Sequence, residues 1–250
     1  MEPSRITHNQ PAMLGKLVVL GKRGKEEGER PFWISYADLM SALMIMFLLV
    51  MSVALLAITN DVTEAERKEV ERTHEIDQIL AKIEQATMDY PGISIDKNRS
   101  VIDFGDRARF ETGSSRLSNE QALYLSTFVS EVLTIAREEL GKKWVKRVIV
   151  EGFADQRGDY LLNLNLSLQR SQRVLCVLLS PPPTQEHVLS PDELEQVREL
   201  FLVGGYSFNS AKESLEESRR IELRLEFFGL DEIRSETPEI PRGDFGTCRI

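Results

Sequence analysis

The sequence is poor in the residues from which metal and redox sites are built. Its 250 residues include two cysteines, Cys176 and Cys248, and three histidines, His8, His74 and His187. The cysteines lack metal-site spacing and the histidines form no cluster, so we expect no metal site. A disulfide is possible in an oxidising compartment, but Cys176 fits better as a small buried apolar residue on a helix.

The sequence also lacks the motifs of common enzyme classes. It has no glycine-rich phosphate loop and no nucleophile elbow, and nothing in it indicates an enzyme or a bound cofactor. The formal net charge is −9 and the pI is about 5.1, which argues against a nucleic-acid partner.

What the chain does have is one long apolar run, from Trp33 to Thr59. Between Leu39 and Ile58 the only polar residues are Ser41 and Ser52. A helix rises about 1.5 Å per residue, so roughly 20 residues cross a ~30 Å hydrocarbon core. The alternative is a buried helix of a soluble protein, but such helices seldom lack a polar face for so long. We therefore predict a transmembrane helix over residues 31–59.

One acidic residue, Asp38, stands at the head of this run. It follows Trp33 and Tyr36, two aromatic residues typical of the membrane–water interface. A carboxylate costs roughly 2.5–3.5 kcal/mol at the centre of a membrane helix and less near its edge, so membrane acids usually serve a function. The alternative is an interfacial aspartate that reaches the lipid headgroups. Because one helix cannot form an ion path, an ion-carrying Asp38 requires other helices around it.

The charges that flank the span indicate its orientation. The first 30 residues hold six Lys/Arg and four acidic residues, while Asp61, Glu64 and Glu66 follow the span. This bias predicts a cytoplasmic tail over 1–30 and a periplasmic C-terminal part. The span lies too far from the start to be a typical cleaved signal peptide.

Residues 60–91 lack Gly and Pro until Pro91 and carry a broken apolar stripe, which predicts a helical linker. This helix is either a solvated spacer or is paired with its copy in a dimer.

A folded domain is predicted over residues 92–229, followed by a tail over 230–250. Helices start at the N-caps Ser118 and Ser190. The expected strands are 93–95, 101–104, 147–151, 202–206 and 221–228, and the expected helices run to about Leu140, from Asn163 to about Leu179, and to about Phe201. This order predicts an α+β fold in which helices cover one side of a mixed sheet.

The span, WISYADLM, resembles the MotB-type subunit of flagellar stators, in which a tryptophan and a tyrosine precede the ion-carrying aspartate. Trp33, Tyr36 and Asp38 hold those positions here. The segments that follow the span resemble the OmpA-like peptidoglycan-binding fold; these are Phe110–Ser114, Glu151–Asp155 with Gly158, Asn163–Ser171 and Arg219–Glu222. The family usually has His-Thr in place of Phe153-Ala154, and Tyr-Asn in place of Leu162-Asn163. These departures concern the wall ligand and not the fold.

The second resemblance implies a site for the diaminopimelate-containing peptide of the cell wall. Asp155 would accept hydrogen bonds from the ligand's ammonium, and Arg170 would hold a carboxylate. Asn163 lies two turns and Leu166 one turn before Arg170 on the same helix face, where Asn163 can bond the peptide and Leu166 can line the pocket. The alternative is a purely structural ion pair between Asp155 and Arg170.

Together the two modules resemble a stator subunit, and the residues after Asp38 look closest to the ZorB family of Zorya anti-phage defence systems. The resemblance implies an inner-membrane protein that forms a homodimer inside a multi-span partner of the ZorA or MotA type, a pentameric ring. It also implies peptidoglycan binding and transport of protons, with sodium as the alternative ion, through Asp38. A flagellar stator subunit and a passive tether between membrane and wall are the alternatives.

Overall fold

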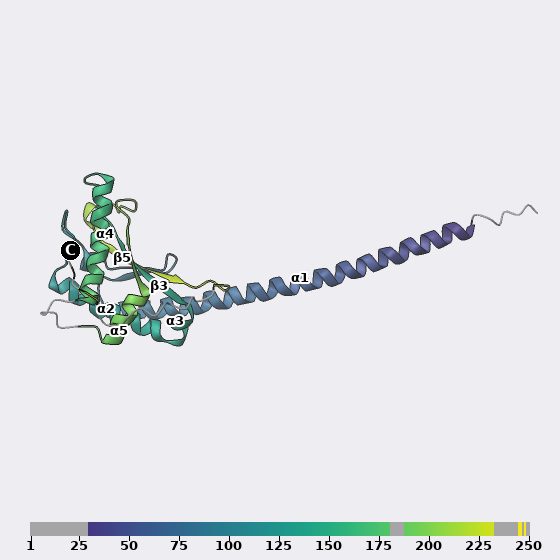
Figure 1. Cartoon of the computed structure of the whole chain (residues 1–250), viewed down its shortest axis with the longest axis horizontal. Coiled ribbons are helices and arrows are strands. Elements are labelled where there is room, and N and C mark those ends of the chain that lie inside the picture. The colour runs from purple at the N-terminus through teal and green to yellow at the C-terminus, as the bar shows by residue number, and fades with distance from the viewer. Residues whose placement is uncertain (1–29, 181–187, 233–244, 247, 249–250) are drawn as a thin grey trace, which may run out of the picture. The chain divides into compact units, whose positions relative to one another are not determined.

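The computed structural model describes residues 30–180, 188–232, 245–246 and 248 (Figure 1). The chain forms two compact units, one that ends at Val62 and one that begins at Thr63. The predicted tail over 1–30 lies almost wholly outside the described residues, as does most of the tail over 230–250.

Helix α1 (Arg30–Thr87) contains the whole apolar run, as predicted. Within the described residues it is the one helix long and apolar enough to cross a membrane. Ser52 and Thr59 donate to the carbonyls of Leu48 and Leu55 at 2.8 and 2.9 Å, so their hydroxyl groups have partners within the helix. The large apolar side chains from Trp33 to Ile58 are exposed in the single chain, for example Leu49 at 63%. A helix with this surface needs lipid or protein around it.

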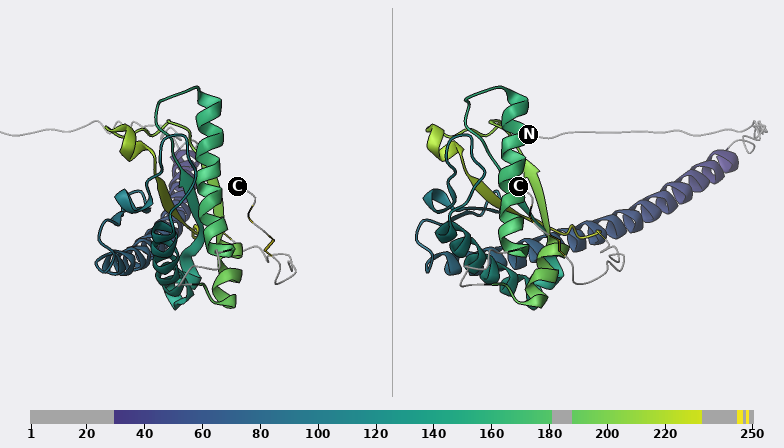
Figure 2. Two further views of the ribbon diagram at one scale, coloured as in Figure 1. Left: turned by 90° about the vertical axis from the view of Figure 1, so that its left-hand side faces the viewer. Right: turned by 60° about the vertical axis from the view of Figure 1, so that its left-hand side comes forward.

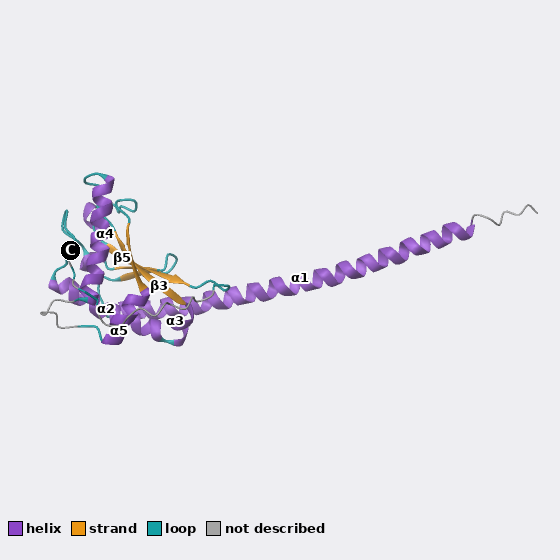
Figure 3. Ribbon diagram, in the orientation of Figure 1, coloured by secondary structure: helices purple, strands orange, loops and turns teal. Residues whose placement is uncertain are grey.

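The second unit is built on a five-stranded sheet of order β1-β2-β5-β3-β4 (Figure 3). The strands are β1 (Ser94–Asp96), β2 (Val101–Asp103), β3 (Val145–Gly152), β4 (Phe201–Gly205) and β5 (Ile221–Phe227). Strands β3 and β4 are parallel and the other pairs are antiparallel, so the sheet is mixed, as predicted.

The helices of this unit are α2 (Asn119–Arg137), α3 (Glu139–Trp144), α4 (Tyr160–Leu179), α5 (Pro191–Leu200) and α6 (Leu215–Ser218), with a 3-10 turn, η1 (Gly105–Ala108). Ser118 and Ser190 form the predicted N-caps, each with a complete capping box. Helix α2 ends earlier than expected because the chain breaks at Glu138 before α3. Helix α4 begins three residues earlier than expected because Asp159 caps it, accepting from the Leu162 amide at 2.8 Å.

The two faces of the sheet differ in polarity. On one face Val148 and Val150 of β3 pair with Leu225 and Leu223 of β5, and all four are buried in the core. Helix α4 packs on β3 and β4, while α2 packs on α4 and α5 (Figure 2). The other face carries cross-strand ion pairs, Arg224–Glu151 at 2.6 Å and Arg147–Glu226 at 2.8 Å. The alternation of apolar and charged residues thus places the helices on one side, as predicted.

The C-terminal turns of α1 belong to the core of the second unit. Ile79, Leu80 and Ile83 are 1–2% exposed and join the same apolar cluster as Phe104 and Phe128. Residues 60–91 are mostly helical, as expected. The C-terminal part of their apolar stripe, from Ile76 to Ile83, packs against the chain's own domain, while Val62 and Val70 are exposed.

The two cysteines form a disulfide, Cys176–Cys248, with a Cα–Cα distance of 5.4 Å. The prediction that Cys176 is a small buried apolar residue is therefore wrong. Its side chain is only partly buried on α4. The sequence does not show this pairing because the two cysteines are 72 residues apart and meet only through the tertiary fold.

Gly152 offers a test of how closely α4 must approach the sheet. A Cβ at this position would lie 1.9 Å from the Ser167 carbonyl oxygen, which is backbone and cannot move independently. We expect Gly152→Ala to lower the free energy of unfolding by about 1–3 kcal/mol or more. The measurement is thermal unfolding of the detergent-solubilised full chain, followed by near-UV circular dichroism. Gly229→Ala is the control, since among the described residues its Cβ would meet Glu232 alone, at 3.8 Å. Equal melting temperatures for the two variants would contradict this packing.

Candidate functional site

A cavity of about 230 Å³ brings together the four residues predicted to bind the cell wall. Asp155 lies in the loop after β3, and Asn163, Leu166 and Arg170 come from α4. The remaining lining residues come from the loop before α2, from the loop after β3 and from α4; they are Thr112, Gly113, Arg157, Leu162, Asn165 and Gln169. The structure therefore places these four residues around one cavity, and their roles in binding stay a prediction.

Asp155 is held by two arginines, and neither is Arg170. Its side chain is 6% exposed; Oδ2 accepts from Arg157 Nη2 at 3.0 Å and from Arg219 Nη1 at 3.1 Å. Oδ1 accepts from the Arg157 amide at 3.1 Å. Burial raises the pKa of Asp155, but these hydrogen bonds together outweigh it and hold the pKa below its usual value. Asp155 is therefore a carboxylate at neutral pH.

Arg170 is fully buried and bonds backbone carbonyls. Its Nε, Nη1 and Nη2 donate to Ser114, Phe153 and Glu111 at 3.0, 2.7 and 3.1 Å. Its guanidinium also lies over the Phe110 ring at 5.0 Å. Burial lowers the pKa of Arg170 to about 10, so the side chain stays protonated at neutral pH. No direct Asp155–Arg170 ion pair forms, which excludes the structural pairing considered above.

Asn163 and the leucines shape the rest of the cavity. Asn163 is 2% exposed and its Nδ2 donates to the Arg157 carbonyl at 2.8 Å, which ties α4 to the loop that carries Asp155. Leu166 lines the cavity, and Leu162 lines it while remaining 58% exposed. The cavity is thus lined both by polar side chains and by the apolar side chains of Leu162 and Leu166.

Two parts of this site were not given a role in the sequence-based prediction. Arg219 lies in the Arg219–Glu222 segment that resembles the family, but its contact with Asp155 depends on how β5 is placed beside β3. Arg157 could have been noticed as a cation two residues after Asp155. Phe153, which replaces the usual histidine, is 2% exposed; it stacks on Tyr206 and lies 4.1 Å from the Arg220 guanidinium. This substitution therefore fills the core and does not line the cavity.

The combination of groups in the cavity suits a zwitterionic ligand. A carboxylate, exposed parts of Arg157 and the amides of Asn165 and Gln169 can pair with an ammonium and a carboxylate of one molecule. Within the described residues no group of three His, Cys, Asp or Glu side chains could hold a metal ion.

Asp38, the predicted ion carrier, lies in the first unit on α1. Its side chain is exposed in the single chain, and its carbonyl accepts from Ser41 Oγ at 3.0 Å. No other acidic or basic residue lies between Trp33 and Thr59.

Comparison with known proteins gives matches over both units. The family model described as membrane MotB of the proton-channel complex MotA/MotB matches residues 21–60. The Zorya protein ZorB of Escherichia coli O139:H28 is 44% identical over 230 residues, which cover 91% of this chain and 93% of that protein.

Solved structures with low identity to the chain also resemble parts of it. The cell wall anchor of the T6SS from Pseudomonas aeruginosa is 20% identical, with a TM-score of 0.35, over 60% of this chain and 97% of that one. The periplasmic domain of Helicobacter pylori MotB is 17% identical, with a TM-score of 0.35, over 55% of this chain and 88% of that one. The identity of 44% across nine-tenths of both proteins is decisive, and the chain belongs to the ZorB family of Zorya proteins.

Proposed function

We propose that this protein is the wall-anchored, ion-driven subunit of a membrane motor that serves anti-phage defence. The observation that carries the proposal is the single acid, Asp38, in the otherwise uncharged apolar run from Trp33 to Thr59, in a chain that also has a charged cavity in its folded domain. Membership of the ZorB family supports the defence role. A flagellar stator subunit is the alternative that shares this architecture.

The cavity around Asp155 is the proposed site for peptidoglycan. The ammonium of a diaminopimelate residue would displace Arg157, whose side chain is about half exposed, from Asp155, while Arg219 keeps the carboxylate in place. Arg170 would act mainly by holding the loops in position, because three of its N–H groups already bond carbonyls. Arg170→Ala is for that reason a poor test, since it leaves buried carbonyls unpaired at about 1–3 kcal/mol each.

Asp155→Asn tests wall binding with little change of shape. We expect it to weaken binding of the detergent-solubilised full chain to purified peptidoglycan by about 2 kcal/mol or more, because the amide cannot pair with an ammonium. Asp103→Asn is a matched control, because Asp103 has similar partners outside the cavity. It accepts a hydrogen bond from the amide of Gly105, two residues later, at 2.8 Å, and it forms an ion pair with Lys212. Equal binding by both variants and the wild type would rule out Asp155 as a ligand.

Asp38 is the proposed carrier of the driving ion. Desolvation disfavours the charged form of a carboxyl group, and contact with water restores it, so alternation between the two environments lets one group take up and release a proton. A charge that crosses 100 mV provides about 2.3 kcal/mol. Sodium needs several oxygen ligands, and near Asp38 this helix offers Ser41 within one turn. Protons are therefore the proposed ion.

Asp38→Asn separates the motor from a passive tether. The amide keeps size and hydrogen bonding but cannot release a proton, and it removes a charge that lipid disfavours. We expect normal expression and normal wall binding with complete loss of protection from phage, measured as plating efficiency. Asp38→Glu, which displaces the carboxyl group by about one methylene, should retain at most partial function. Full protection by Asp38→Asn would exclude the ion-driven motor and leave the passive tether as the remaining function.

The proposed assembly is a homodimer of this chain inside a multi-span membrane partner of the ZorA or MotA type, for which we propose a pentameric ring. The uncovered apolar surface of α1 supports a protein or lipid environment for residues 33–58. The proposed orientation has the N-terminus in the cytoplasm and the domain in the periplasm. The disulfide supports this orientation, because such bonds persist in oxidising compartments such as the bacterial periplasm.

The orientation predicts how the cysteines react in cells. With the domain in the periplasm, Cys176 and Cys248 should be oxidised, and a thiol-reactive polymer should not shift the denatured chain on a gel unless a reductant is added first. In cells that lack the periplasmic disulfide-forming system, the shift should appear without reductant. The Cys176→Ser/Cys248→Ser double variant is the unshifted control. Free thiols in normal cells would place the domain in the cytoplasm.

A further inference from the structure

A second cavity, of about 350 Å³, lies beside the proposed wall site. Among its lining residues are Arg116, Asn119, Arg173, Cys176 and Cys248. The two cavities share two structural elements. In the loop before α2, Gly113 lines the first cavity and Arg116 lines the second. On α4, Arg170 lines the first cavity and Arg173, three residues later, lines the second. An extended polymer that leaves the first cavity along α4 therefore reaches the second.

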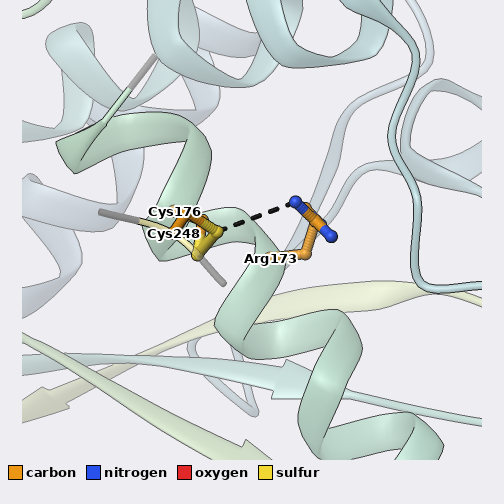
Figure 4. Close-up of a disulfide and its surroundings, with 3 residues drawn as sticks. All are labelled: Arg173, Cys176 and Cys248. Carbon is orange, nitrogen blue, oxygen red and sulfur yellow. Dashed lines mark hydrogen bonds between the residues drawn. A yellow bond between two sulfur atoms is a disulfide. The ribbon is translucent and has the colours of Figure 1, made fainter. Parts of the chain in front are cut away.

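Arg173 lacks a strong acceptor in the part of the chain that the structure describes. Its Nη1 lies 3.7 Å from the Cys248 sulfur, a weak acceptor, as Figure 4 shows. Its Nε is buried and has no hydrogen-bond partner among the described residues. A buried donor without a partner is unusual in proteins and indicates a missing acceptor.

Among the residues that the structure describes, those that line the second cavity carry positive charge without a matching acid. Arg116 is exposed. Within the described residues, neither Arg116 nor Arg173 forms an ion pair, and no Asp or Glu of the described chain lines the cavity. Two arginines in one cavity, one from the loop and one from α4, favour a planar anion that can accept several hydrogen bonds.

We propose that Arg116 and Arg173 bind a carboxylate of the same peptidoglycan peptide whose diaminopimelate occupies the first cavity. This inference rests on the proposed wall-binding function and extends it from one site to two adjacent sites. A carboxylate that enters the second cavity balances the charge of both arginines and can accept from the guanidinium groups that line it. Carboxylates are abundant in the wall peptide, so the second contact adds affinity for the wall rather than a new ligand.

The disulfide is part of this second site. Cys248 lines the cavity because its bond to Cys176 holds it against α4. Formation of the bond therefore completes the site only where the domain is oxidised, which is the compartment that contains the wall. The Cys176→Ser/Cys248→Ser variant should bind the wall more weakly, in the same direction as loss of Arg173.

The test measures binding of the detergent-solubilised full chain to purified peptidoglycan. We expect Arg173→Gln and Arg116→Gln each to weaken binding about tenfold, the effect of losing a charge-assisted hydrogen bond. Lys142→Gln, which removes one exposed positive charge on α3, is the control and should bind as the wild type does. Near-UV circular dichroism checks that each variant is folded, and Arg116 is exposed enough that its loss should not affect folding.

A second arm identifies the ligand group. On peptidoglycan whose carboxylates have been converted to amides, the wild type and Arg173→Gln should bind equally, because no carboxylate remains for the arginine. A difference that survives amidation would mean that Arg173 acts through the fold, and would overturn the proposal. Equal binding of wild type, Arg116→Gln and Arg173→Gln to native peptidoglycan would also overturn it and leave the first site intact. Failure of the wild type to bind any peptidoglycan would instead refute the wall-binding function itself.

Discussion

The buried guanidinium of Arg170 is the interaction on which the folded domain and its candidate site depend. It reaches from α4 to the carbonyls of Glu111 and Ser114 in one loop and of Phe153 in another. These loops are 39 or more residues apart in sequence, and each supplies residues to the first cavity. A charged group with no exposed surface is costly unless its donors are paired. Arg170 meets that condition with backbone acceptors, so its primary role is to fix the position of both loops.

The same helix fixes the position of Asp155 from two sides. Arg170 bonds the Phe153 carbonyl, two residues before Asp155, and Asn163 bonds the Arg157 carbonyl, two residues after it. Arg219 then adds an ion pair from beside β5. The carboxylate is thus held in place before any ligand arrives, and a ligand need not supply the free energy for ordering this loop. The exposed Arg157 is the one partner that a cationic ligand can replace.

Local signals allowed most of the fold to be predicted, and long-range contacts account for what was not. Ser118 and Ser190 start their helices as expected, because a capping box is encoded within four residues. The four proposed wall-binding residues share a cavity because a loop and the helix after it position them together. The Cys176–Cys248 bond and the Arg219–Asp155 pair depend on how distant segments meet, which periodicity and propensity do not encode. The short helix α6 does have a local signal, the capping box of Ser214 and Glu217, which the prediction missed.

The packing of the C-terminal turns of α1 makes part of its apolar stripe unavailable to a second copy of the chain. The apolar stripe of residues 60–91 was open to two readings, a solvated spacer or a helix paired with its copy. In the structure Ile79, Leu80 and Ile83 are buried against the chain's own domain, together with the partly buried Ile76. Burial of one such side chain stabilises the fold by about 1.5–3 kcal/mol, so a second copy would have to compete with the domain core for the same residues. A homodimer contact along α1 would therefore have to use other residues, such as the exposed Val62 and Val70, while the C-terminal turns of α1 belong to the core of the domain.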